Sequence, residues 1–114
     1  MIKEKTITFG EHLRMLRENS GLTLKQVASS VSTDVSLLAK IERNERQPTK
    51  QLINSIAEFF NIEKEILFEE LLSDQIAYKI LNENANLKIL KVAEKKVSYL
   101  KAIRNVKRNR NIQI

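Results

Sequence analysis

The chain has 114 residues and a formal net charge of +6, and 42% of its residues are hydrophobic and 30% charged. This is the size and composition of one small globular domain with a short appendage. The lack of Cys and the single His exclude disulfides, thiolate nucleophiles and zinc sites built from Cys and His within one chain. Because no apolar run approaches the roughly 18 residues that span a membrane, and the first residues lack the apolar stretch of a signal peptide, the sequence predicts a cytoplasmic protein without membrane contact.

The positive charge is concentrated in the last part of the chain. From Lys88 onward there are nine Lys and Arg residues and a single acid, Glu94, which gives this stretch a charge of +8 and leaves −2 for residues 1–87. A basic segment of this kind points to a polyanionic partner, most often nucleic acid. With only 2 Gly and 1 Pro, and with many Leu, Ile, Lys and Glu residues, the chain has few turn formers for a sheet, so the composition predicts an all-α fold.

Two capping boxes predict where the first two helices begin. In Thr8-Phe9-Gly10-Glu11 the hydroxyl can accept from the backbone three residues on, and the carboxylate can reach back. This helix should end at Gly21, where glycine can take a left-handed conformation. Thr23-Leu24-Lys25-Gln26 repeats the box and opens a short second helix. The inward residues of that helix are expected to be Val27, Ala28 and Val31.

The next two helices are predicted from single caps. After a turn at Ser32-Thr33, Asp34 is a good N-cap for a third helix, and Asn44 can adopt the left-handed conformation that ends it. The buried side of this helix should be Leu37, Leu38 and Ile41. Thr49 is placed to cap a fourth helix that ends at Asn61-Ile62.

A short second helix, a turn and a third helix with an exposed polar side form the helix-turn-helix pattern, whose second member can enter a major groove. A closer likeness lies in Gly21-Leu22-Thr23, Gln26-Val27-Ala28, Val31, Asp34, Leu38, the run Lys40 to Arg46, and Pro48. With these residues, positions 7–68 resemble the Cro/C1 (XRE) repressor-like family. Within that family, residues 34–46 and 71–93 are similar to small controller-like regulators associated with restriction and methyltransferase genes. The sequence departs from the family pattern at Leu24, Ser32, Thr33 and Asn44.

The exposed face of the third helix is expected to read bases. If Leu38 and Ile41 are buried, four residues lie on the opposite face of this helix. The base-contacting positions of the resembled family fall on the same four residues. These are Val35, Ser36, Ala39 and Lys40. Lys40 can donate to guanine O6 or N7, and the small apolar side chains can pack on a thymine methyl group. A solvated surface role is the alternative for Lys40. Phosphate contacts are expected from Thr23, Lys25, Arg43, Asn44, Arg46 and Lys50.

Two further side chains have a structural assignment. In the resembled family an arginine of the first helix pairs with the glutamate of the Ile-Glu-Arg run, which implies a pair between Arg17 and Glu42 that joins the first helix to the third. His12 has no partner His, Cys or carboxylate pattern, so it is expected to be a surface histidine and not a metal ligand.

The second part of the chain has more apolar surface than one small bundle can cover. A fifth helix is predicted from about Glu63, and a sixth after the helix-breaking cluster of residues 82–86. The residues expected to form a dimer interface are Leu71, Leu72, Ile76, Ile80, Leu90, Ala93, Val97 and Leu100. Those of the sixth helix follow the 3, 4, 3 spacing of a helix-pairing seam. Packing of the sixth helix on the fifth of its own chain is the alternative that this pattern leaves open.

The fold expected from these patterns is all-α. It is a five-helix repressor-like DNA-binding domain with a helix-turn-helix, extended by a C-terminal helix. The expected divisions are residues 1–68 for the DNA-binding domain and 69–104 for a helical dimerisation extension. Residues 105–114 form a basic tail that either contacts DNA phosphates or is a solvated helix end.

The predicted function is that of a sequence-specific transcriptional regulator and not of an enzyme. It binds double-stranded DNA as a homodimer on a (pseudo)palindromic operator and controls restriction-modification genes. No catalytic residue, metal or cofactor is expected. The alternative is the antitoxin of a toxin–antitoxin pair, in which the fifth and sixth helices bind a toxin and DNA binding serves autoregulation. A toxin and RNA polymerase are therefore further candidate partners.

Overall fold

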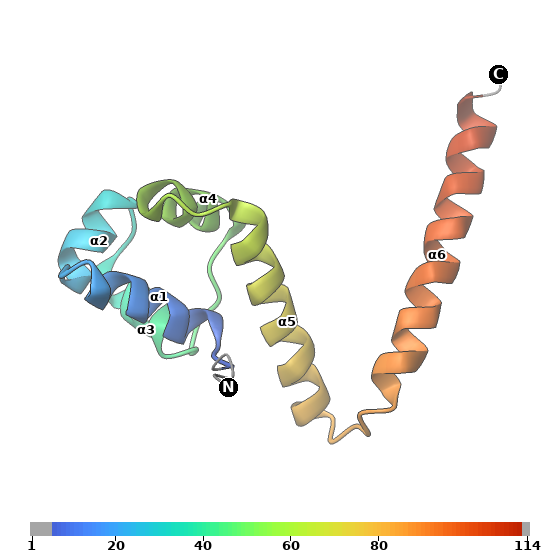
Figure 1. Ribbon diagram of the computed structural model, residues 1–114, viewed down its shortest axis with the longest axis horizontal. Helices are drawn as coiled ribbons and strands as arrows, with labels where there is room; N and C mark the ends of the chain where they lie inside the picture. Colours follow the sequence, from blue (N-terminus) through green and yellow to red (C-terminus); the bar gives the residue numbers. More distant parts are fainter. Residues whose placement is uncertain (1–5, 113–114) are drawn as a thin grey trace, which may run out of the picture. The chain divides into compact units, whose positions relative to one another are not determined.

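The computed structural model describes residues 6–112, with the backbone alone for residues 110–112. This part of the chain forms six α-helices and no strand (Figure 1). They are α1 (Phe9–Asn19), α2 (Leu24–Ser30), α3 (Val35–Glu42), α4 (Lys50–Phe60), α5 (Lys64–Asn82) and α6 (Ile89–Ile112). The predicted all-α fold is therefore confirmed. The chain divides into two compact units between Ala77 and Tyr78. Over the described residues, no helix has both the length and the apolar character that crossing a membrane requires.

Both predicted capping boxes are present. The Thr8 hydroxyl accepts from the Glu11 backbone at 3.2 Å, and the Thr8 backbone donates to the Glu11 carboxylate at 3.0 Å. At the start of α2, Thr23 and Gln26 make the same pair of bonds at 3.1 and 2.8 Å. Each box satisfies backbone groups that the first turn of a helix would otherwise leave unpaired. The starts of both helices are thus fixed by the local sequence.

The turns around the helix-turn-helix contain three left-handed residues, of which Gly21 and Asn44 were expected and Ser32 was not. Gly21 has φ +69°, while Ser32 and Asn44 have φ of 57° and 62°. Ser32 and Asn44 stand where the resembled family has glycine, so these two departures change the residue and keep the backbone conformation. Asparagine tolerates this region through local hydrogen bonding, whereas an ordinary side chain costs about 1–2 kcal/mol there. The predicted left-handed end of α3 is confirmed.

Asp34 caps α3 differently from expectation. It occupies the N-cap position with the extended backbone angles φ −72° and ψ 143°, but its side chain makes no capping hydrogen bond. The exposed carboxylate therefore favours the helix start through its charge next to the positive end of the helix dipole. The capping position was predicted correctly, and the capping hydrogen bond was not.

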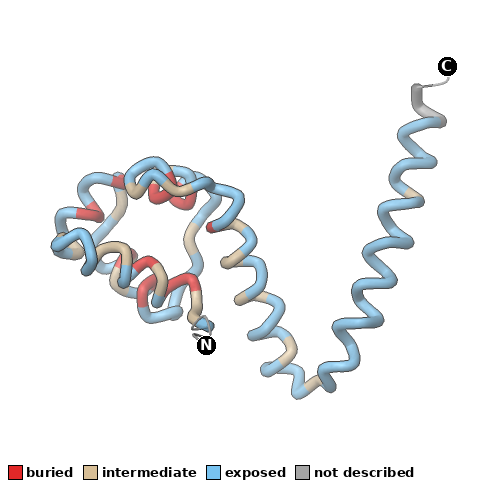
Figure 2. Tube along the Cα trace, in the orientation of Figure 1, coloured by how far each residue is buried: buried red, intermediate tan, exposed pale blue. Residues whose placement is uncertain are grey.

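One hydrophobic core joins α1 to α4 with the first turn of α5, and its buried residues are red in Figure 2. They are Phe9, Leu13, Val27, Ala28, Val31, Leu38, Ile41, Leu52, Ile53, Ile56, Ala57 and Leu67. Helix α3 contacts both α1 and α2. The helix expected to read DNA is therefore held from two sides by buried contacts.

Gly10 allows α1 to approach the end of α3 closely. A Cβ atom at this position would overlap the Ile41 carbonyl oxygen and would lie 2.7 Å from the Glu42 carbonyl oxygen. Both are backbone atoms, which cannot move aside without shifting α3. The absence of a side chain at Gly10 is therefore a requirement of the packing.

We expect Gly10→Ala to lower the free energy of unfolding by about 3 kcal/mol, the upper part of the usual range for overpacking. Gly21→Ala is the matched control, because a Cβ at Gly21 meets no atom within 4 Å and only its left-handed backbone is strained. That strain should cost about 1–2 kcal/mol. Denaturant unfolding of both variants measures the difference, and equal losses would contradict the close contact.

Helix α5 is bound to the start of α1 by two polar contacts. The Phe9 backbone N–H donates to Asp74 Oδ2 at 2.7 Å, and His12 Nδ1 lies 2.9 Å from Glu70 Oε1. The prediction that His12 is a surface histidine is wrong, because the ring is half-buried and its carboxylate partner lies 58 residues away in sequence. Glu70 and Asp74 lie beyond residue 68, the expected end of the DNA-binding domain.

The second unit contains the end of α5 and the whole of α6. Asn84 has φ 51°, and backbone bonds from Asn84 to Leu81 and from Ala85 to Ile80 close the last turn of α5. This is the bond pattern of a Schellman motif. Helix α6 continues through Ile112, so most of the expected basic tail is helical. Residues 113–114 of that tail, like residues 1–5 of the expected first domain, lie outside the described residues.

Candidate nucleic-acid interface

Helix α3 has one buried side and one outward side. Leu38 and Ile41 are completely buried, whereas Val35, Ser36 and Lys40 are exposed. Ala39, the fourth residue expected to contact bases, is half-buried. The structure therefore brings the four predicted residues together on the outward side, with Ala39 nearest the protein.

The residues expected to contact phosphates are all exposed. Thr23 and Lys25 lie at the start of α2, where the first-turn amides also favour an anion. Lys50 is the first residue of α4, and Arg46 lies in the segment before it. The structure thus offers exposed cations at the starts of α2 and α4, and first-turn amides at α2, an arrangement suited to DNA phosphates.

Three of the expected phosphate ligands already have partners within the protein, since Thr23 is bonded to Gln26 in the capping box of α2. The Arg43 Nε donates to Glu45 Oε2 at 2.5 Å. This hydrogen bond raises the pKa of Arg43 above its usual range and lowers the pKa of Glu45. The Asn44 side-chain amide donates to the Thr8 hydroxyl at 2.9 Å, which ties the end of α3 to the start of α1. Arg43 would have to exchange a carboxylate for a phosphate to contact DNA.

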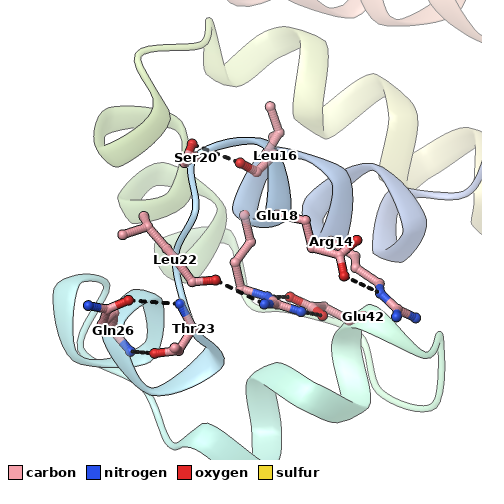
Figure 3. A network of polar contacts seen from close by, with 9 residues as sticks. Arg14, Leu16, Glu18, Ser20, Leu22, Thr23, Gln26 and Glu42 are labelled. Atoms are coloured by element: carbon pink, nitrogen blue, oxygen red, sulfur yellow. Dashed lines mark hydrogen bonds and ion pairs between the residues drawn. The ribbon is translucent and has the colours of Figure 1, made fainter.

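Arg17 and Glu42 form the ion pair that the family resemblance implied. Arg17 donates from Nε and Nη2 to the two Glu42 oxygens at 2.7 and 3.0 Å, and from Nη1 to the Leu22 carbonyl at 3.0 Å. The hydrogen bonds at Glu42 and Leu22 are drawn in Figure 3. The side chains of Arg17 and Glu42 are only 13% and 5% exposed. The bond to Glu42 raises the pKa of Arg17. One guanidinium therefore links α1, the segment before α2, and α3.

A family comparison identifies the class of this fold. The chain matches the model of the helix-turn-helix domain over residues 8–71, which is more than half of its length. The chain belongs to the helix-turn-helix family. This match confirms the helix-turn-helix that the residues around α2 and α3 predicted, and it agrees with the predicted Cro/C1 (XRE) type of DNA-binding regulator.

One curated relative is similar to the chain over part of its length. It is 35% identical over 69 residues to the HTH-type transcriptional regulator DdrOP3 of Deinococcus deserti, covering 59% of this chain and 54% of the relative. The chain thus spans about half the length of that curated relative.

Among solved structures, the restriction-modification controller protein C.AhdI of Aeromonas hydrophila is 32% identical. That likeness covers 52% of this chain and 89% of the other, with a TM-score of 0.49. The clp gene regulator ClgR of Corynebacterium glutamicum is 20% identical over 77% of this chain and 88% of its own, with a TM-score of 0.50.

The sequence reasoning missed three polar partners near this interface. Glu45 was not recognised as a partner of Arg43, although the two residues are close in sequence. Glu70 and Asp74 were not singled out, because nothing in a linear pattern shows which residue of α1 they meet. No group of three or more His, Asp or Glu side chains that could hold a metal ion is found in the part of the chain that the structure describes.

Proposed function

We propose that the protein is a sequence-specific transcriptional regulator that binds a (pseudo)palindromic operator as a homodimer, with α3 in the major groove. The observation that carries this proposal is the outward side of α3, where Val35, Ser36 and Lys40 are exposed, while Leu38 and Ile41 on the opposite side are completely buried. A helix held in this way presents its side chains to base edges without rearrangement. The Arg17–Glu42 pair fixes its orientation relative to α1.

The proposed roles follow from the chemistry of each side chain. Lys40 donates to guanine O6 or N7, and Ser36 bonds to a donor or acceptor on a base edge. Val35 and Ala39 pack on a thymine methyl group. Phosphates are bound by side chains that carry no sequence information, namely Thr23, Lys25, Arg43, Asn44, Arg46 and Lys50.

A homodimer is proposed because one recognition helix reads only a few base pairs, and two half-sites one turn apart need a two-fold symmetric protein. Helix α5 offers surface for it, since Leu72 is 56% and Ile76 is 46% exposed. A groove of about 490 Å³ beside Leu72 is lined by Pro48, Lys50, Phe68, Leu71 and Gln75. Ile80 of α5 is half-buried, and the expected interface residues of α6 are exposed: Leu90, Ala93, Val97 and Leu100.

Control of restriction-modification genes is the proposed physiological role. It is supported by the resemblance of residues 34–46 and 71–93 to controller-like regulators, and it places the protein in the cytoplasm with its operator. The second candidate is an antitoxin, which the exposed apolar side chains of α5 and α6 favour because a toxin could cover them. A neighbouring methyltransferase or nuclease gene supports the first role, and a small toxin gene the second. RNA polymerase is a further candidate partner for an activator.

We expect Lys40→Ala to weaken operator binding by about 1–3 kcal/mol and to relax the preference at one base pair per half-site, because it removes a groove donor. Selection of bound DNA from a random pool supplies the operator and measures the preference. Lys50→Ala is the matched control, since loss of a phosphate contact should weaken binding to operator and random DNA equally. An equal loss on both DNAs for Lys40→Ala would assign Lys40 to the phosphate contacts.

A further inference from the structure

The two helices that carry the exposed apolar side chains have complementary faces. We propose that α6 of one copy lies antiparallel along the outward face of α5 of a second copy, so that two copies exchange their α6 helices. This inference rests on the proposed homodimer and specifies its interface. It is carried by the order of charged and apolar residues along the two helices.

The outward face of α5 begins acidic and continues apolar. Glu65, Glu69, Leu72 and Ile76 are exposed and follow one another at spacings of 4, 3 and 4, opposite the buried Leu67. In the described residues neither Glu65 nor Glu69 has an ion-pair partner. The other acids of this helix behave differently, because Glu70 and Asp74 are bonded to α1.

The seam of α6 has the reverse order. Its first half carries Leu90, Ala93, Val97 and Leu100, and the same spacing then continues with Arg104 and Lys107. All six side chains are exposed, and no ion pair involves either cation within residues 6–109. The seam is therefore apolar near the start of the helix and positive near its end.

An antiparallel arrangement places the apolar residues of α5 opposite those of α6, and the acids of α5 opposite the cations of α6. If Ile76 lies opposite Val97, then Glu69, seven residues before Ile76, lies opposite Arg104, seven residues after Val97. In the same register Leu72 meets Leu100, Ile80 meets Ala93, and Glu65 meets Lys107 and its neighbour Arg108. A parallel arrangement would instead set the cations of α6 against the apolar half of α5.

Other occupants fit the seam of α6 less well. Two α6 helices paired in parallel would put Arg104 and Lys107 next to their own copies, and Glu94 is the only acid on each helix to offset that repulsion. DNA phosphates would pair with the cations but would leave Val97 and Leu100 in water. The outward face of α5 supplies both the acids and the apolar surface.

When two copies exchange their α6 helices, each α5 face and each α6 seam is covered once, and no surface is left for a third copy. Every copy has one outward α5 face and one α6 seam, so a two-fold axis lets both pairs form and leaves neither face over. The resulting dimer buries two helix–helix interfaces, and it links the two DNA-binding units through residues that are remote from α3.

The natural absence of Cys allows a direct test by cross-linking. One preparation of the full chain carries Ile76→Cys and another carries Val97→Cys, both at exposed positions. The two are mixed and oxidised mildly, because a disulfide forms only when the Cβ atoms come within about 4.5 Å. We expect the mixture to form disulfide-linked dimers at least ten-fold faster than either preparation alone. Ser98→Cys is the matched control for Val97→Cys, since it is adjacent in sequence and lies off the seam, and it should cross-link slowly.

Other cross-linking results would contradict the exchange of α6 helices and would show which helices pair instead. Fast cross-linking of Ile76→Cys alone indicates α5 against α5, and fast cross-linking of Val97→Cys alone indicates α6 against α6. A chain with both substitutions that becomes an internally bonded monomer indicates pairing within one chain. A wild-type dimer that binds its operator while the mixture fails to cross-link overturns only the exchange, whereas a monomer also overturns the proposed homodimer.

A charge reversal tests the polar half of the same interface. Glu69→Lys and Arg104→Glu should each weaken dimerisation by about ten-fold, because the dimer contains the pair twice and an exposed ion pair contributes about three-fold. The two changes combined in one chain should restore the dimer, because every pair again joins an acid to a base. If the double variant dimerises more weakly than either single variant, the proposed register is wrong.

Discussion

A chain that ends at Asn82 is expected to be monomeric and to bind its operator orders of magnitude more weakly than the full chain. The cut removes α6 and keeps every side chain proposed to contact bases. In a dimer, binding of one copy to its half-site holds the second copy at a high effective concentration near the other half-site. A monomer lacks this linkage, so it binds each half-site independently and weakly. The cut lies at the end of α5 because an earlier one, after Leu67, would also remove Glu70 and Asp74, which hold α1.

Sedimentation of the full and shortened chains measures the first part of this expectation. Circular dichroism should show that the shortened chain keeps its helices, since all the buried core residues found in the structure precede Phe68. On DNA with a single half-site, both chains should bind with the same weak affinity. This control shows that the shortened chain has lost the linkage between two copies and not the base-contacting side of α3. An undiminished dimer after the cut would place the interface outside α6.

Arg17→Ala is expected to lower the free energy of unfolding by about 3–5 kcal/mol, the cost of breaking a buried ion pair on one side. The Glu42 carboxylate, only 5% exposed, would lose both of its hydrogen bonds, and the Leu22 carbonyl would lose a donor. Water cannot replace these bonds fully at a buried site. Glu42→Ala should be less costly, because the guanidinium would keep its bond to Leu22.

Denaturant unfolding of four variants tests the buried pair. Arg14→Ala is the control, because Arg14 and Glu18 form an exposed pair on the same helix and should lose no more than about 1 kcal/mol. The double change Arg17→Met with Glu42→Leu should recover most of the stability, since apolar side chains of similar size leave no charge without a partner. Small, additive losses for the two single variants would show that the pair is not coupled.

The features that follow from neighbouring residues were predictable from the sequence. The capping boxes at Thr8 and Thr23 and the left-handed Asn44 all depend on residues within a few positions of each other. The inward residues of α2 and α3 followed from helical spacing, because the side chains of a helix repeat with its turn. The approximate bounds of α1 to α4 and the outward side of α3 were therefore predictable from the sequence, whereas the end of α6 at Ile112 was not.

Contacts between residues that are far apart in the sequence could not be predicted from such local patterns. The bond between Phe9 and Asp74 joins residues 65 positions apart, and nothing in the spacing of α5 shows that its acids meet α1. The Arg17–Glu42 pair, 25 positions apart, was expected only because the family has such a pair. Even the nearby Arg43–Glu45 pair was missed, since two charges two residues apart at a helix end have no fixed geometry in the sequence.

The bond from Phe9 to Asp74 has a consequence for the order of events on the ribosome. Synthesis starts at the N-terminus, so the first amide of α1 has to wait for an acceptor made 65 residues later. Translation therefore reaches α5 before α1 is locked into place. The fully buried core residues found in the structure all precede Phe68, so the nascent chain can bring them together once Leu67 has left the ribosome and before α6 has emerged from it. Helix α6 thus emerges beside a domain that is already folded, free to meet a finished second chain.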